Sequence, residues 1–309
     1  MEPRTELGEF LRSRRARLRP EDVGLVSHGG RRRVPGLRRE ELSMLAGVSV
    51  AYYTRIEQGQ TRGASDAVLD AIARVLRLTD DERTYLYNQA RQRPRMLRRP
   101  RPEQLRPAVR AMIEAFGRVP ALVIDRRADV LAWNRLGHAL LAGHLPFLAP
   151  RSERERPNLG RLVFLDPHMR DLYVDWRGKA RDAVAYLRMS AARYPHDPRL
   201  TELIGALTVL SPEFGGLWAA HPVRECAHSV REYRHPLVGS LHLRDELLWL
   251  PDDEGQRMVI YGPDADDPPT VAALALLADT IEQAQAQAQA GGPDPGAAAG
   301  TAGRRLLAT

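Results

Sequence analysis

The residues best suited to specific chemistry lie in the segment 49–55, where a serine and small apolar residues precede a threonine and an arginine. An arginine guanidinium can donate two parallel hydrogen bonds to the O6 and N7 atoms of guanine, and a threonine hydroxyl can donate or accept one. Small apolar side chains can contact the methyl group of thymine. The side chains predicted to read base edges in the major groove are Val50, Ala51, Thr54 and Arg55.

The segment that must position these side chains is LSMLAGVSVAYYTRIEQG, residues 42–59, whose spacing is typical of a helix-turn-helix. Such a motif needs a small residue where its two helices cross and a turn residue that tolerates positive φ, and Ser43 and Gly47 meet these needs. Ser49 is predicted to cap the second helix, whose first backbone N–H groups can also hold a phosphate. Tyr53 belongs to the packing face, and we expect its hydroxyl to reach the edge of the domain. Since any pair of short helices can produce this pattern, its context matters.

A basic stretch precedes the motif, in a loop longer than a tight turn between the first two predicted helices. Its arginines could contact phosphates or enter a minor groove, and the alternative is a solvated basic loop. The predicted phosphate contacts are Arg31, Arg32, Arg33, Arg38 and Arg39.

The charge of the chain is unevenly distributed. Residues 1–107 contain 23 arginines and no lysine against 14 acidic residues, a net charge of +9, which leaves 23 basic and 25 acidic residues, a net charge of −2, for the rest. A basic segment joined to a near-neutral one is expected when a nucleic-acid-binding domain is attached to a domain with another task.

The periodicity of apolar residues predicts how the chain is organised. Spacings of three and four predict a five-helix domain over residues 1–91, and the prolines and arginines of 92–107 predict a linker. Residues 108–284 combine short β-type runs, beginning with a hairpin at 121–134, with helices near 175–194, 199–210 and 270–284, which indicates an α+β domain. The low-complexity tail, 285–309, is predicted to be disordered.

The second domain contains aromatic residues that could line an apolar pocket as a group, although ordinary core packing is the better explanation for each of them alone. A histidine near the mouth of such a pocket could hold a carboxylate. The predicted ligand-binding residues are Trp133, Phe164, Tyr173, Trp176, Trp218 and His221, with Phe214 and His228 as further candidates.

Other functions have weaker support. The segment HPVRECAH, 221–228, gathers potential metal ligands, but its spacing fits no standard zinc arrangement, and we predict neither a metal nor a cofactor. No G-x-S-x-G, H-E-x-x-H, C-x-x-C or phosphate-loop pattern is found, so an enzyme is not expected. Without an apolar run of membrane-spanning length or a signal core, and with Cys226 as a single thiol, a cytoplasmic protein is expected.

Residues 5–91 resemble the XRE, or lambda-repressor-like, helix-turn-helix regulators, and RRRVPGLRREELSMLAGVSVAYYTRIEQG is closely similar to their MmyB-like branch. The resemblance continues through VLAWN (130–134), NLGRLVFLDP (158–167), SPEFGGLWAAH (211–221) and HPLVGSLHL (235–243). It implies a PAS-like domain that binds a small apolar, fatty-acid-like molecule. The sequence thus predicts a homodimeric regulator that binds operator DNA in response to this ligand. The alternatives are an enzyme or a protein-interaction module with an accessory helix-turn-helix domain.

Overall fold

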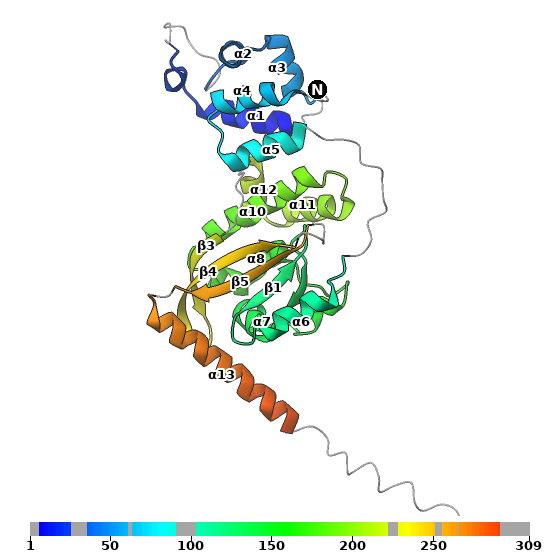
Figure 1. The fold of residues 1–309 in the computed structure, drawn as a ribbon, viewed down its shortest axis with the longest axis vertical. Helices are drawn as coiled ribbons and strands as arrows, with labels where there is room; N and C mark the ends of the chain where they lie inside the picture. The colour runs from blue at the N-terminus through cyan, green and yellow to red at the C-terminus, as the bar shows by residue number, and fades with distance from the viewer. Residues whose placement is uncertain are drawn as a thin grey trace, which may run out of the picture.

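In the computed structural model, the described residues are 6–25, 36–60, 64–90, 103–221, 228–250, 255–264 and 266–290. They form a helical domain followed by a larger α+β domain, from which a final long helix extends (Figure 1). The predicted linker, apart from its last residues, lies outside the described residues, as does the tail beyond residue 290.

The helical domain contains the five helices that the periodicity predicts. They are α1 (Glu6–Arg17), α2 (Arg39–Ala46), α3 (Val50–Glu57), α4 (Asp66–Val75) and α5 (Asp80–Ala90), with a 3-10 turn at Pro20–Val23. Their inward faces form one core around the fully buried side chains of Phe10, Leu42, Tyr53, Leu69 and Tyr85. The lambda-repressor-like class of this domain is therefore confirmed.

Gly36 fixes the approach of the chain to α2. Its φ of +80° lies in the left-handed region, and a Cβ at this position would lie 2.3 Å from the carbonyl oxygen of Arg15. The next residue, Leu37, donates its N–H to that same oxygen at 3.1 Å, and the Arg15 guanidinium donates to the Leu37 carbonyl at 2.6 Å. Only glycine combines this conformation with so close a contact, so the entry to α2 is held against α1.

The second domain is built on a five-stranded antiparallel sheet in the order β2-β1-β5-β4-β3. The strands are β1 (Ala121–Ile124), β2 (Val130–Trp133), β3 (His228–His235), β4 (Gly239–Trp249) and β5 (Arg257–Pro263). The predicted hairpin is confirmed as β1 and β2, and the α+β, PAS-like class is confirmed with it. The segment VRECAHSVREY, 223–233, is strand-like in sequence, and its residues 223–227 lie outside the described residues.

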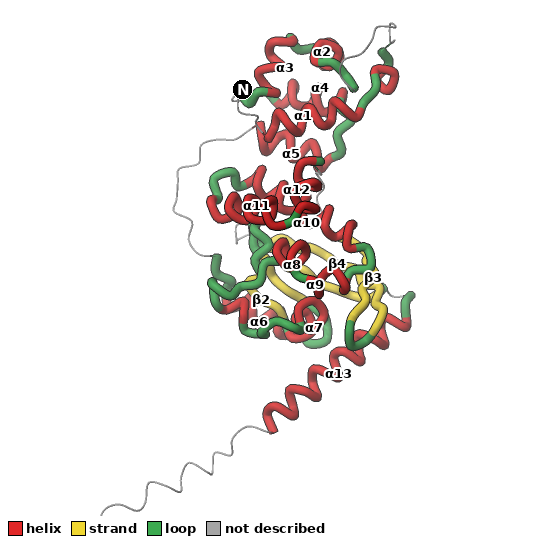
Figure 2. The backbone as a smooth tube through the Cα atoms, turned by 180° about the vertical axis from the view of Figure 1, so that it is seen from behind, coloured by secondary structure: helices red, strands yellow, loops and turns green. Residues whose placement is uncertain are grey.

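Helices cover the two faces of the sheet unequally. Figure 2 shows α7 (Arg135–Ala142), α8 (Leu159–Leu165) and α9 (Pro167–Leu172) in front of one face. On the other face, α6 (Pro107–Ala115) packs against β1, β2 and β5, so β1 and β2 are buried on both faces. β4 alternates between buried and exposed residues, as expected for a strand with one face in solvent.

Three further helices lie between the sheet and the helical domain (Figure 1). The last helix of the chain extends away from the sheet. The connecting helices are α10 (Trp176–Arg193), α11 (Pro198–Leu210) and α12 (Pro212–Ala219), and the last is α13 (Pro268–Ala290). The prediction ended this final helix near residue 284, whereas α13 continues six residues into the predicted disordered tail. Its alternating alanine and glutamine residues are strong helix formers, which explains the extension.

Direct contacts join the two domains through α1. Arg14 donates to the carbonyl oxygen of His221 at 2.7 Å, and Arg188 of α10 donates to the carboxylate of Glu6 at 2.8 Å. Both arginines are almost fully buried, and Ala192 of α10 belongs to the core of the helical domain. The second domain is thus in contact with the helix on which α3 packs.

Candidate nucleic-acid interface and ligand cavity

The helix-turn-helix consists of α2, a turn at Gly47 and α3. Gly47 has a φ of +67° and ends α2 by donating its N–H to the carbonyl oxygens of Met44 and Ser43. Ser49 then caps α3, because its hydroxyl accepts the N–H of Tyr52 at 3.1 Å. The small Ser43 is buried between the helices, as the motif requires. The sequence prediction of these local roles is confirmed.

The structure places the predicted DNA-reading residues together on one face of α3. Ser49, Val50, Ala51 and Arg55 are exposed, and Thr54 is half-buried. Within the described part of the chain, Arg55 makes no ion pair that would hold its guanidinium against the protein. This face can therefore present an arginine fork, a hydroxyl and small apolar groups to a groove.

Behind this face, α3 is anchored by a buried carboxylate. Glu57, with 1% of its side chain exposed, lies 3.1 Å from the Arg15 guanidinium and 2.5 Å from the Arg39 guanidinium. Burial raises the pKa of the neighbouring Tyr53 phenol well above its ordinary value. The cluster joins α1, the first residue of α2 and the last residue of α3.

Two details differ from the sequence prediction. Tyr53 is fully buried, so its hydroxyl does not reach the edge of the domain; the reason is that α1 covers it. Arg39, a predicted phosphate contact, is partly occupied by its ion pair with Glu57. Arg38 is exposed, whereas Arg31, Arg32 and Arg33 lie outside the described residues.

The predicted ligand-binding residues are distributed over the interior. Trp133 and Tyr173 pack on the sheet, whereas Phe164, Phe214 and Trp218 belong to a second cluster under α10 and α11, with Trp176 between the two. The indole N–H groups of Trp133 and Trp176 donate to the carbonyl oxygens of Phe147 and Val163. None of these aromatic residues lines either of the two cavities that lie beside α13.

The two remaining residues predicted to bind the ligand are histidines, His221 and His228. His221 lies at the contact with α1, 3.4 Å from the Glu9 carboxylate, with a φ of +52°. The side chain of His228 and residues 222–227, which make up most of the segment HPVRECAH, lie outside the described residues. Among the described residues, no group of three or more histidine, cysteine or acidic side chains is placed to hold a metal ion.

A cavity of about 580 Å³ lies elsewhere, between α7, α13 and the turn joining β3 to β4. Its apolar walls include Phe147, Leu237 and Ile281, and Arg135 lies at its edge with its guanidinium over the Phe147 ring. A second space of about 430 Å³ adjoins it and is also lined by Arg135, Phe147 and Ile281. In the larger cavity, apolar walls beside the single arginine Arg135 suit an apolar molecule that carries a carboxylate.

Four histidines also line the larger cavity: His138, His144, His168 and His235. The His144 and His168 rings are 4.3 Å apart, and His144 lies 2.7 Å from the Asp166 carboxylate. The sequence analysis missed this group because its members come from α7, α9, β3 and a loop. Only the spacing of Arg135 and His138, one helical turn apart, offered a local signal.

His235 should make the stability of this region depend on pH. Burial lowers the pKa of His235, and the hydrogen bond that its Nε2 donates to the Ala139 carbonyl oxygen at 3.0 Å only partly opposes this; its Nδ1 accepts the N–H of Leu237. Below the unfolded value of about 6.5, the unfolded chain takes up a proton that the folded chain resists, so stability is lost as pH falls. We expect the thermal midpoint to fall between pH 7 and pH 5, and to fall less in His235→Gln. An equal fall in both proteins would contradict this role; burial also lowers the pKa values of His138, His168 and His221, which contribute to the remaining slope.

The exposed recognition helix and the attached α+β domain define a DNA-binding transcription regulator. Residues 6–86 match a helix-turn-helix domain, and residues 105–277 match the MmyB-like transcription regulator ligand-binding domain. The chain belongs to this MmyB-like family of transcription regulators. No curated protein shows significant similarity to it. Within the described residues, no helix has the length and apolar character needed to span a bilayer.

Proposed function

We propose that the protein binds operator DNA as a homodimer and that a small apolar ligand in the second domain modulates this binding. The observation that carries the proposal is the exposed face of α3, where Arg55 makes no ion pair with the residues that the structure describes and which Glu57 holds from behind. In this assignment Val50, Ala51, Thr54 and Arg55 read bases, while Ser49, Arg38 and the preceding arginines contact phosphates. Two recognition helices related by a dimer axis would enter major grooves about one helical turn apart.

Operator binding should weaken steeply with salt, because phosphate contacts release bound counterions. The logarithm of the association constant is expected to fall linearly with the logarithm of salt concentration, with a slope of about −0.9 per phosphate contacted. Fluorescence anisotropy on DNA upstream of its own gene measures this slope. A flat dependence, or no preference over unrelated DNA, would indicate instead that the helical domain binds a protein partner. Sedimentation of the free and DNA-bound protein tests the dimer.

The ligand site that we propose is the cavity beside α13, where Arg135 would hold a carboxylate and the apolar walls a hydrocarbon chain. This assignment replaces the dispersed aromatic residues as the main ligand contacts, since they fill the core. Because α1 contacts both Arg188 and α3, a ligand that shifts the second domain could change the population of dimer geometries that fit the operator.

Arg135→Ala tests the carboxylate contact. We expect about a 10-fold loss of affinity for a long-chain fatty acid, in line with one charge-assisted hydrogen bond, and little change for the fatty alcohol of equal length. Native mass spectrometry or displacement of a fluorescent fatty acid measures both. Equal losses for acid and alcohol would assign Arg135 a structural role only, and chemical turnover of the bound molecule would favour the enzyme alternative.

A further inference from the structure

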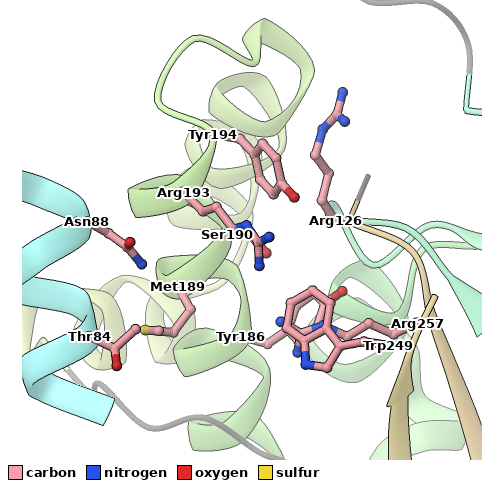
Figure 3. Close-up of a pocket in the computed structure, with 11 residues that line it drawn as sticks. Thr84, Asn88, Arg126, Tyr186, Met189, Ser190, Arg193, Tyr194, Trp249 and Arg257 are labelled. Atoms are coloured by element: carbon pink, nitrogen blue, oxygen red, sulfur yellow. The ribbon is translucent and has the colours of Figure 1, made fainter. Parts of the chain in front are cut away.

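A small polar cavity lies at the junction of the two domains (Figure 3). Thr84 and Asn88 of α5 line one side, and Ser190 and Arg193 of α10 and Arg257 of β5 line the others. Its volume is about 50 Å³. Because one water needs about 10–15 Å³, this space suits a small polyatomic ion and not an apolar metabolite.

Arg257 is a buried cation without a counterion in the described part of the chain. Only 8% of the residue is exposed. Its guanidinium carbon lies 3.7 Å from the centre of the Trp249 ring and 4.7 Å from that of Tyr186, and Figure 3 shows it beneath the indole. These stacking contacts fix the plane of the guanidinium but provide no acceptor for its N–H groups, and an uncompensated buried charge is unfavourable.

A second guanidinium shares the same indole. Arg193 lies 4.9 Å from the Trp249 ring centre, and it too has no carboxylate partner among the described residues. Arg126, the third arginine of the cavity, differs because Glu103 and Asp197 each lie 2.7 Å from it and compensate its charge. One buried and one exposed guanidinium, neither with a carboxylate partner among the described residues, therefore meet at one small cavity.

We propose that this cavity binds a phosphate group, either inorganic phosphate or a small phosphomonoester, between Arg193 and Arg257. Planar guanidinium groups match phosphate oxygens through paired hydrogen bonds, and a dianion balances two cations. The cavity shares no residue with the cavity beside α13, so it is a separate site. A bound phosphate would connect α5 to α10 and β5. An effect of phosphate on operator binding rests on the proposed function, whereas phosphate binding itself does not.

Isothermal titration calorimetry of the full chain with inorganic phosphate at constant ionic strength tests the site. We expect saturable binding that weakens at least about 10-fold in Arg257→Gln and in Arg193→Ala. Arg177→Ala, which removes an exposed arginine at the other end of α10, is the matched control and should bind as wild type does. Parallel titrations with glycerol 3-phosphate and acetate separate the two phosphate sources from a carboxylate.

Absence of saturable phosphate binding in the wild type would overturn the proposal, as would unchanged binding in both cavity variants or tighter binding of acetate. The loop joining β4 to β5 contains Asp252, Asp253 and Glu254 in its sequence. If their carboxylates filled the site, the wild type would not bind phosphate, and the proposal would fail. Should Arg257→Gln not fold, Arg193→Ala decides alone, since that side chain is exposed. Because the titration contains no DNA, a failure to bind phosphate can be distinguished from a failure to bind the operator.

Discussion

Glu57→Ala is expected to destabilise the helical domain by about 3 kcal/mol, which should lower its thermal midpoint by more than about 10 °C. The carboxylate is almost fully buried and compensates Arg15, whose side chain is only 12% exposed. Removing it leaves a buried guanidinium that still donates to the Leu37 carbonyl oxygen but has no carboxylate partner among the described residues, whereas Arg39 is exposed enough to turn toward solvent. Calorimetric or circular-dichroism melting of the full chain measures the change.

The matched control is Asp70→Ala, which removes an acidic residue from an ion pair with Arg83 in the same domain. Both partners of that pair are substantially exposed, so the midpoint should change little. A double variant, Arg15→Met with Glu57→Leu, removes both buried charges and should recover most of the stability. A midpoint in Glu57→Ala close to that of Asp70→Ala would mean that the buried pair does not hold α3 in place.

The stability of this cluster matters for DNA recognition because it fixes the end of α3 from inside the domain. Glu57 is on the buried side of α3, opposite the exposed Ala51 and Arg55. A recognition helix that is held by its own core can keep side chains aligned with base edges, which bidentate contacts require. The same cluster explains why Arg39 is less available to phosphate than Arg38.

The helix-turn-helix could be predicted from the sequence because its determinants are local. Gly47 and Ser49 act within one turn of their own positions, so residue type and spacing suffice. The same pattern gave no information on the partners of Tyr53 and Glu57, because Arg15 lies on another helix. The expectation that the Tyr53 hydroxyl reaches the domain edge was wrong for that reason.

In the second domain, the sequence predicted the class and the longer elements but not the short helices α6, α8, α9 and α12. Each is nine residues or fewer. Three begin with proline at the first helical position, and two of these prolines follow the capping residues Asp166 and Ser211. The pattern of a capping residue followed by proline was therefore the available signal.

The sequence could not separate aromatic residues of the core from those of a pocket, because both have the same local pattern. Trp133 and Phe164 are buried by packing, whereas the cavity beside α13 is lined by apolar residues such as Leu237 and Ile281 together with four histidines and Arg135. The contacts of Arg14 and Arg188 between domains were equally hidden, since their partners lie 207 and 182 residues away in the chain. Such long-range pairings depend on the assembled fold.

Arg55→Ala is expected to lower affinity for the operator about 10-fold to 100-fold and to relax the preference at one base pair, because the lost bidentate contact contributes about 1–3 kcal/mol. Arg38→Ala should instead weaken all sequences about equally and reduce the salt slope by about one. Arg161→Ala, an exposed arginine of α8 in the other domain, is the control for loss of charge. An operator selected from random duplexes by the wild type, titrated in anisotropy with single-base variants, measures all three. A guanidinium that contacts only phosphate carries no sequence information. If Arg55→Ala weakened the binding of every duplex equally while Arg38→Ala changed the preferred sequence, the assignment of Arg55 to base reading would therefore be wrong.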